Sequence, residues 1–407
     1  MSTFFLRNNL SCVAASTNSS TYTSFSDTIG LNPWDSSKYD GISAVYFEIT
    51  LKLTHACAPN GSPTAYAELY NQTDGSSISG SEVSTTTVGS FVVLRSGDIS
   101  ANMPSGNKKI LIRLKTQSSC ATVEYRQADL IIVLSNSTKW RQWIHVGSNE
   151  FTTSTSYVEY TARKRFLFTS GNWDGTVSYM IGGTLTNNTV SVLDTMFADL
   201  YDVTAGATVS GSEISELPSN TPAYYTSSTF TLTDGNDYTG RQKTGSSIKG
   251  TGNTTRNLHL IIDQSDTPTK LEAHYQLLTR ALNINNTAYT DSDFKFIYDT
   301  ATFSNCTRTL YHEGVLRSDN AIRTTYMQLT DDGSAMTNSE ISENAVSYER
   351  NRSASLTEPA DGSEIEMQYK RSSGTGSGDL SHDRFILTIT GLEIEASGSQ
   401  FVFCIGG

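Results

Sequence analysis

The six histidines and five cysteines of this 407-residue chain are the residues best suited to catalysis or metal binding, yet their spacing fits neither. His312-Glu313 is followed by Gly314, Val315 and Leu316, so the HExxH zinc pattern is not completed. The sequence contains no Cys-x-x-Cys pair, no GxSxG nucleophile elbow and no P-loop. His382-Asp383 precedes a predicted strand and is interpreted as a solvated turn. We therefore expect no catalytic residue, no cofactor, no metal site and no enzymatic activity.

The residues alone leave two further questions open, calcium binding and disulfide pairing. Carboxylates cluster in predicted loops at 233–237, 291–293 and 331–332, but none completes a twelve-residue EF-hand, so calcium is only a candidate ligand. Cys57 and Cys120 flank strand-like runs, and a Cys57–Cys120 disulfide is the alternative to free buried thiols.

The strongest pattern in the chain is an internal repeat of about 130 residues. The segments AELYNQTDGSSISGSEVS (67–84), ADLYDVTAGATVSGSEIS (198–215) and MQLTDDGSAMTNSEIS (327–342) align. Each segment has a leucine at its third position and a glutamate third from its end, and these repeat-defining residues are Leu69, Leu200 and Leu329 with Glu82, Glu213 and Glu340. Because a folding device must recur in every copy while a catalytic site need not, we interpret the glutamates as structural, each satisfying backbone N–H groups at a Ser-x-Glu corner.

Other recurring residues lie at equivalent positions in the three copies. Each copy begins with an extended segment and a tyrosine, namely Tyr22, Tyr157 and Tyr289, and ends in an apolar strand. The first two copies share a tryptophan and an Asp-Gly turn, Trp34 with Asp40-Gly41 and Trp173 with Asp174-Gly175, and the third lacks that tryptophan. Short polar joints place the boundaries so that the modules are residues 1–135, 136–265 and 266–407, the last being the most diverged. We expect them to follow one another like beads with limited bending.

Period-2 alternation predicts the secondary structure of each module. In 46–53, Phe47, Ile49, Leu51 and Leu53 share one face of a strand. The segment 269–282 could form a helix, but its counterparts look extended, so a strand is predicted. Many short strands joined by Asp-Gly turns predict an all-β fold of three tandem antiparallel β-sandwich domains, jelly-roll-like or immunoglobulin-like.

Composition narrows the classes of partner that this chain could bind. The net charge of −12 disfavours nucleic acid, and the basic clusters 163–165 and 108–109 are interpreted as solvated charges. No apolar run is long enough to span a membrane, and the first residues do not form a convincing signal peptide. Exposed aromatics could bind a surface glycan: Tyr224-Tyr225 is one platform, and Trp140 and Trp143 have opposite parity on a predicted strand, so one should face outward.

The run AELYNQTDGSSISGSEVSTTTVGSFVVLRSGDI, closing with YRQADLIIVL, resembles β-sandwich modules in structural proteins of tailed bacteriophages and related environmental viruses. The resemblance implies a virion surface protein, either a capsid decoration protein or a head or tail fibre component. Its partners would be other virion proteins or copies of itself, as a trimer or filament. It transfers no site residue. The alternatives are a subunit of a cellular extracellular filament or surface layer, and a glycan-binding adhesin.

Overall fold

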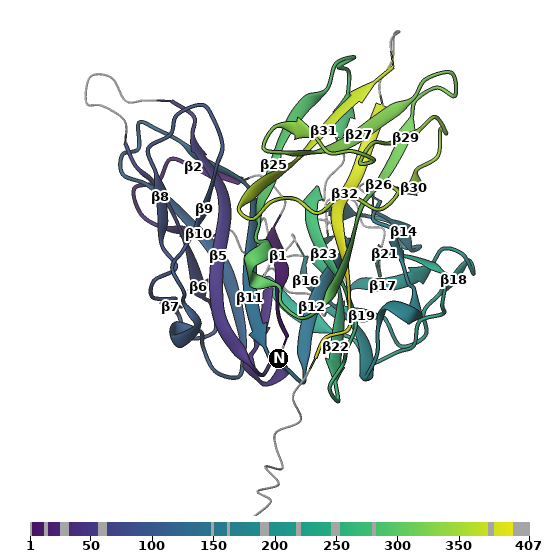
Figure 1. Ribbon diagram of the computed structural model, residues 1–407, viewed down its shortest axis with the longest axis horizontal. Coiled ribbons are helices and arrows are strands. Elements are labelled where there is room, and N and C mark those ends of the chain that lie inside the picture. The colour runs from purple at the N-terminus through teal and green to yellow at the C-terminus, as the bar shows by residue number, and fades with distance from the viewer. Residues whose placement is uncertain are drawn as a thin grey trace, which may run out of the picture.

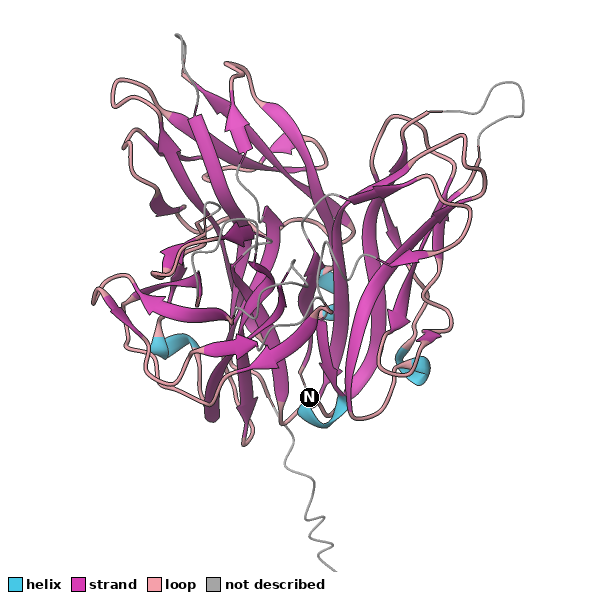
Figure 2. Ribbon diagram, turned by 180° about the vertical axis from the view of Figure 1, so that it is seen from behind, coloured by secondary structure: helices cyan, strands magenta, loops and turns pink. Residues whose placement is uncertain are grey.

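A computed structural model shows an all-β fold, and its described residues form 32 strands in six sheets and four short 3-10 turns (Figures 1 and 2). The structure describes residues 2–11, 15–24, 32–55, 63–147, 150–160, 163–187, 195–216, 221–245, 253–278, 282–372 and 378–393. Two sheets come from each third of the chain. We call these thirds repeat 1 (residues 3–135), repeat 2 (140–265) and repeat 3 (271–393).

The elements recur in nearly the same order in each repeat. Repeat 1 contains β1 (Thr3–Ser11), β2 (Ala15–Thr17), β3 (Thr23–Ser24), β4 (Asn32–Asp35), η1 (Ser36–Lys38), β5 (Ile42–Leu53), β6 (Ala65–Asn71), β7 (Ser76–Ser77), β8 (Val83–Thr85), β9 (Val92–Arg95), η2 (Ser100–Asn102), β10 (Asn107–Thr116) and β11 (Val123–Ser135). Repeat 2 contains β12 (Trp140–Gly147), β13 (Glu150–Thr152), β14 (Val158–Glu159), β15 (Phe166–Leu167), η3 (Ser170–Asn172), β16 (Thr176–Asn187), β17 (Met196–Asp202), β18 (Ala207–Thr208), β19 (Ile214–Glu216), β20 (Ala223–Thr226), β21 (Asp237–Thr244) and β22 (Asn253–Ser265). Repeat 3 contains β23 (Leu271–Leu278), β24 (Leu282–Ile284), β25 (Thr290–Tyr298), η4 (Thr300–Thr302), β26 (Thr307–Ser318), β27 (Thr325–Asp331), β28 (Ser334–Ala335), β29 (Ile341–Glu343), β30 (Glu349–Arg352), β31 (Ser363–Arg371) and β32 (Gly378–Thr390).

The strand order of the first sheet is the same in all three repeats. It runs β1-β11-β5-β9, then β12-β22-β16-β20, then β23-β32-β26-β30, and every pairing is antiparallel. The second sheets, such as β3-β10-β6-β7, are also equivalent. The segment beginning at 271 forms strand β23, which confirms the extended prediction for it.

Alternation places the apolar faces of the two sheets toward a shared core. In repeat 1, Phe47, Ile49 and Leu51 of β5 and Leu69 of β6 are buried in it. The Asp-Gly turns also behave as expected, because Gly75, Gly235, Gly333 and Gly362 all take positive φ values that favour glycine.

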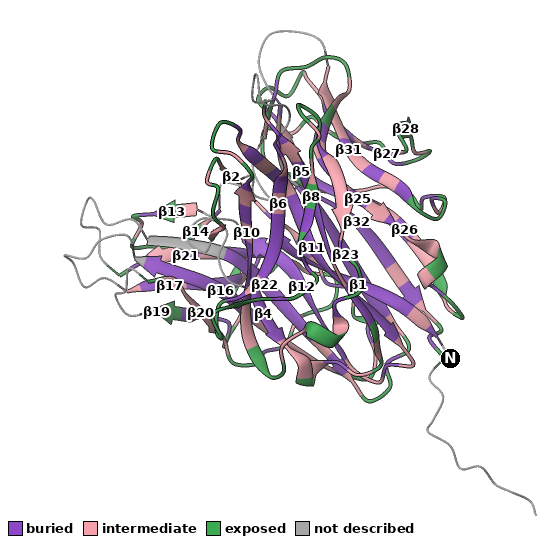
Figure 3. Ribbon diagram, turned by 90° about the vertical axis from the view of Figure 1, so that its left-hand side faces the viewer, coloured by how far each residue is buried: buried purple, intermediate pink, exposed green. Residues whose placement is uncertain are grey.

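The first strands of the three repeats meet at the centre of the molecule, so the expectation of beads in a row is wrong (Figures 1 and 3). β1 contacts both β12 and β23, and all eight residues of β12 and of β23 are buried. Phe5 of β1 stacks on Tyr275 of β23 at 5.5 Å between ring centroids, and Phe4 meets Trp140 of β12 edge-on at 5.0 Å. Such aromatic pairs stabilise the centre beyond the area they bury.

This central packing corrects the expectation that one tryptophan of β12 faces outward. Trp140 and Trp143 are 1% and 2% exposed, because one face of β12 covers its own repeat and the other lies against neighbouring first strands. Tyr224, the other proposed sugar platform, places its hydroxyl group over Gly182 inside the protein. Trp140 and Trp143 therefore do not form an exposed glycan platform, whereas Tyr224 and Tyr225 are both half-buried.

Candidate functional site: a tyrosine, glutamate and lysine cluster on each outer sheet

The repeat-defining glutamates each lie at one exposed cluster on the outer sheet of their repeat. We call these the outer clusters. Each has a tyrosine just before the first strand of that sheet (β3, β14 or β25), a second aromatic residue, a glutamate and a lysine: Tyr22, Tyr66, Glu82 and Lys115; Tyr157, Phe197, Glu213 and Lys243; Tyr289, Tyr326, Glu340 and Lys370. Lysine and aromatic residue come from paired strands, β10 with β6, β21 with β17 and β31 with β27.

The geometry of the outer clusters is nearly constant. The tyrosine hydroxyl donates a hydrogen bond to the glutamate carboxylate in all three, over 2.6 Å from Tyr157 to Glu213. The lysine ammonium lies 4.1, 4.3 and 4.1 Å from the centroid of the tyrosine ring, and 4.7, 4.7 and 4.8 Å from that of the second aromatic ring. It also lies 3.5, 4.0 and 3.8 Å from the glutamate. Each lysine is thus held by two cation–π contacts and one ion pair.

Electrostatics follow from this arrangement. Partial burial, and then the hydrogen bond to a carboxylate, raise the pKa of Tyr22, Tyr157 and Tyr289 above the usual value for tyrosine. The phenols therefore stay protonated and keep donating. The glutamate side chains remain about half exposed, at 48%, 50% and 50%. A partner can reach their free oxygen atoms, while the tyrosine fixes their orientation.

The backbone role assigned to the glutamates belongs instead to the serine before each of them. The hydroxyl group of Ser81 accepts a hydrogen bond from the Leu69 N–H at 2.9 Å and donates one to the Ile78 carbonyl at 2.7 Å. Ser212 and Ser339 make the equivalent bonds to Leu200 and Leu329. All three serines are fully buried. The serine recurs beside the glutamate in the sequence, so this signal was present but was attributed to the wrong residue.

Several candidate residues outside the outer clusters lie in surroundings that differ from their predicted ones. Asp383, interpreted as part of a solvated turn, lies within β32 and is fully buried against His312. Lys164, from a basic cluster interpreted as solvated, is 1% exposed. Cys120 is disulfide-bonded, but its predicted partner Cys57 lies outside the described residues, as do Cys12 and Cys404; Cys306 is free. Within the described ranges, no group of three or more His, Cys, Asp or Glu side chains is placed to hold a metal ion.

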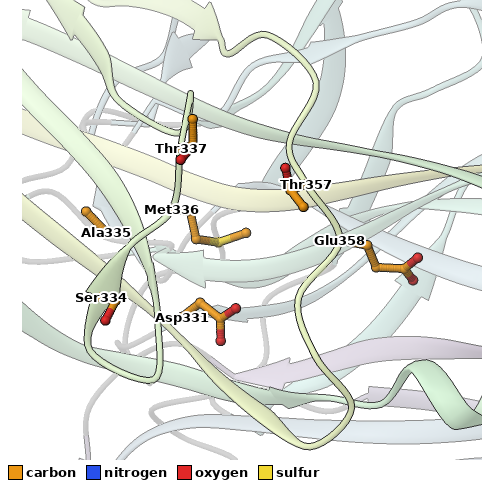
Figure 4. Close-up of a pocket in the computed structure, with 7 residues that line it drawn as sticks. All are labelled: Asp331, Ser334, Ala335, Met336, Thr337, Thr357 and Glu358. Carbon is orange, nitrogen blue, oxygen red and sulfur yellow. The ribbon is translucent and has the colours of Figure 1, made fainter.

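One cavity of about 270 Å³ opens on repeat 3, beside the β27–β28 hairpin (Figure 4). Two acids line it, Asp331 and Glu358. The Glu358 carboxylate accepts hydrogen bonds from Tyr298 at 2.9 Å and from Arg308 at 2.6 and 3.0 Å. This carboxylate is already engaged in an ion pair, so we assign no proton-transfer role to the cavity.

Comparisons with known proteins add little to this geometry. No protein-family model matches the sequence, and no curated protein matches it. Among solved structures, a chain of Sulfolobus Turreted Icosahedral Virus has 14% identity over 86% of this chain and 81% of its own, with a TM-score of 0.20. A chain from an archaeal virus with a triple jelly roll fold and turret assembly has 13% identity over 95% and 91%, also at 0.20. The glycosylasparaginase PNGase F from Flavobacterium meningosepticum has 12% identity over 63% and 97%, again at 0.20. Likenesses at these TM-scores carry no argument about function. Within the described residues, no helix is long and apolar enough to cross a membrane.

Proposed function

We propose that this chain is a non-enzymatic virion structural protein on the particle exterior, a capsid decoration protein or a head or tail fibre component. In this proposal each pair of sheets is one β-sandwich module, jelly-roll-like or immunoglobulin-like. The modules are residues 1–135, 136–265 and 266–407. Three such modules in one chain would imitate a trimer and assemble with other virion proteins or with further copies.

The observation that carries the proposal is the repetition of one joint around the molecule. The Asp40 carboxylate accepts hydrogen bonds from the backbone N–H groups of Thr138 at 2.7 Å and Lys139 at 3.1 Å, where repeat 1 passes into repeat 2. Asp174 accepts the same bonds from Thr269 at 2.7 Å and Lys270 at 2.9 Å, where repeat 2 passes into repeat 3. Each aspartate precedes a positive-φ glycine, Gly41 or Gly175, in which an added Cβ would lie 2.3 Å from a carbonyl oxygen.

The third joint has the same form without a covalent link. Ser304 stands where the other repeats have aspartate, and its hydroxyl group accepts a hydrogen bond from the Thr3 N–H at 3.1 Å. The next residue, Asn305, has a φ of 51°, in the left-handed region that Gly41 and Gly175 occupy. The Ser2 N–H donates to the Glu393 carbonyl at 2.9 Å, so the start of repeat 1 lies beside the end of repeat 3. The three repeats therefore close into a ring.

A closed ring with three matching outer clusters favours an assembly role. Symmetric assemblies reuse the same contact on each unit, whereas a catalytic site is needed only once. Tyrosine is enriched at protein interfaces because its ring is apolar and its hydroxyl group can still form hydrogen bonds. The ring thus supports a building block with three equivalent outer faces.

Immunogold electron microscopy tests this proposal. Antibodies raised against the purified chain would be applied to particle and cell-surface fractions of its source. We expect gold on the outside of intact particles. Gold along free filaments or on a cell surface would instead support the extracellular filament or surface-layer alternative.

A second test measures the contact itself. The variant Tyr66→Ala/Phe197→Ala/Tyr326→Ala removes one aromatic residue from each outer cluster, and Tyr70→Ala outside the clusters is its control. Sedimentation velocity should show concentration-dependent assembly for the wild type and the control, but not for the triple variant at equal thermal stability. A wild-type chain that stays monomeric alone and with its particle would contradict the assembly role.

A further inference from the structure

One position at the centre of the molecule differs chemically among the three repeats. It is the seventh residue of the 13-residue strands β11, β22 and β32, namely Asp129, His259 and Arg384. On the neighbouring strand, the seventh residue is Glu48, Gly182 or Glu313. Each pair is directly cross-strand in its sheet. The same place in the fold therefore holds a carboxylate in repeats 1 and 3 and none in repeat 2.

Repeats 1 and 3 balance their buried charge at this position. Glu48 accepts from Arg7 at 2.5 Å and from Arg95 at 2.6 Å. Glu313 accepts from Arg384 at 2.8 Å and from Arg352 at 2.9 Å. Opposite charges in contact remain paired over a wide pH range, since arginine does not lose its proton.

At this position of repeat 2, the described side chains are neutral or basic. His145 of β12 pairs directly with His259 of β22, and their ring centroids are 4.3 Å apart. Both side chains are almost fully buried, at 2% and 0% exposed. Among the residues that the structure describes, no side chain forms a hydrogen bond with any of their four ring nitrogens, and only the backbone at Asn9 and Gly147 favours a charge on His145. The place of the missing carboxylate is taken by the Tyr224 hydroxyl group, which lies over Gly182.

The surroundings of the two rings favour their neutral forms. Trp143 packs on His259 from the same sheet, at 5.9 Å between centroids, and the Asn9 backbone of β1 lies on the His145 side. The protonated form of His259 and the buried Lys164 oppose a charge on His145, and Lys164 opposes a charge on His259. Burial, and then these neighbours, hold the pKa of His145 well below its usual value and lower that of His259 to about 3.

We propose that His145 and His259 form an acid-sensitive release at the contact between repeats 1 and 2, whose protonation separates β12 from β1. A proton on either ring adds a cation near Lys164, and no carboxylate of the described residues is hydrogen-bonded to either ring. β12 is also the strand that contacts β1 and follows the Asp40 joint, so loosening it opens the ring between repeats 1 and 2. The other two contacts keep their ion pairs. The inference does not depend on the virion proposal.

The sign of the pH effect follows from linkage. A histidine whose folded-state pKa is depressed contributes stability above about pH 6.5, and this stability is lost as pH falls toward the folded value. Each such histidine raises the unfolding equilibrium constant about tenfold for every unit by which the pH falls below about 6.5. His274 shares this direction, whereas burial of Glu216 and Glu366 raises their pKa values to about 8 and about 7 and opposes it. The test must therefore compare the wild type with a variant that lacks only this pair.

His145→Leu/His259→Leu removes the titration and keeps apolar volume, and His55→Gln at the exposed His55 is the control. As the pH falls from 6.5 to 4.5, the unfolding equilibrium constant of the wild type divided by that of the variant should rise about hundredfold per pH unit. The control should follow the wild type. A ratio that stays constant with pH would overturn the proposal.

Hydrogen–deuterium exchange locates the release along the chain. On moving from pH 7.5 to 5.0, with intrinsic rates corrected, peptides covering 140–147 and 258–265 should lose protection in the wild type and keep it in His145→Leu/His259→Leu. The peptide covering 384–390, at the ion-paired contact, should behave alike in the two proteins. Loss in 140–147 and 258–265 that is equal in the wild type and the variant would contradict a release at the first contact.

Discussion

Ser304 accepts a hydrogen bond from the backbone N–H of Thr3, and this bond joins repeat 3 to the start of repeat 1 as Asp40 and Asp174 join consecutive repeats. The Ser304 N–H in turn donates a hydrogen bond to the Thr3 carbonyl at 2.9 Å. Because an internal copy of this joint is covalent and this one is not, the ring should be most vulnerable where Phe4 and Phe5 follow the joint.

Phe5→Ala tests the closure. Phe5 is fully buried and contacts Tyr275, Tyr298 and Phe303 of repeat 3, so truncation should lower the free energy of unfolding by about 3–5 kcal/mol. Urea denaturation measures this. Phe151→Ala, at a phenylalanine that is 57% exposed, should change it by less than about 0.5 kcal/mol. Equal effects of the two substitutions would contradict a packed closure.

The corner serine should matter more for stability than the glutamate beside it. Ser81→Ala leaves the buried Leu69 N–H without its partner and should cost about 1–3 kcal/mol. Glu82→Gln keeps an acceptor for Tyr22 on an exposed side chain, and should cost less than about 1 kcal/mol. Thermal and urea unfolding of both variants show which substitution costs more stability. A larger loss for Glu82→Gln would restore the structural interpretation of the glutamate.

His312 should make repeat 3 sensitive to alkaline pH. Its Nδ1 lies 2.6 Å from the Ser339 carbonyl and its Nε2 lies 2.6 Å from Asp383, so both nitrogens donate and the ring is charged. Burial opposes this charge, but Asp383 outweighs it and raises the pKa of His312. A raised pKa gives stability that is complete below about pH 6.5 and is lost as pH rises through the folded value, by about 1.4 kcal/mol per pH unit.

Repeat 1 supplies the matched control for this prediction, because Phe47 and Ala128 occupy the same strand positions as His312 and Asp383. His312→Phe/Asp383→Ala should flatten the stability profile above pH 6.5. Urea midpoints measured from pH 6 to 9 check it. An unchanged slope in the variant would show that another group titrates.

Reduction should destabilise repeat 1. Cys120 is disulfide-bonded, and Cys57 is its predicted partner. A bridge that closes such a loop typically contributes about 2–5 kcal/mol. Peptide mapping under non-reducing conditions should recover a Cys57–Cys120 peptide, and Cys57→Ser should lower the unfolding temperature by as much as a reducing agent does. A Cys12–Cys120 peptide would refute the predicted pairing.

The sequence predicted the all-β class, the period of the repeat and the extended state of 271–278, because these depend on local alternation and recurring turns. It mispaired one landmark: the residue before the joint aspartate is Tyr39 in repeat 1 and Trp173 in repeat 2, so Trp34 is not the counterpart of Trp173. In repeat 3 that position is Phe303, which preserves the aromatic ring although the tryptophan is absent.

The ring could not be predicted from the sequence, because its contacts join residues from different repeats. Arg7 contacts the Ile297 carbonyl, and Arg350 pairs with Asp237. A strand pattern shows that β12 is apolar, but not that a neighbouring repeat covers its second face. The prediction of an exposed tryptophan was wrong for that reason, whereas Asp383 is buried within its own repeat, against His312.

A circular permutant tests the closed ring most directly. The new chain would begin at Lys139, join Glu393 to Ser2 through a short glycine and serine linker, and end at Thr138. If the three joints are equivalent, the permutant should fold with the same sedimentation coefficient and a free energy of unfolding within about 2 kcal/mol of the original. An unfolded or aggregated permutant would contradict the ring, provided that the original order with the same linker added at its end folds normally.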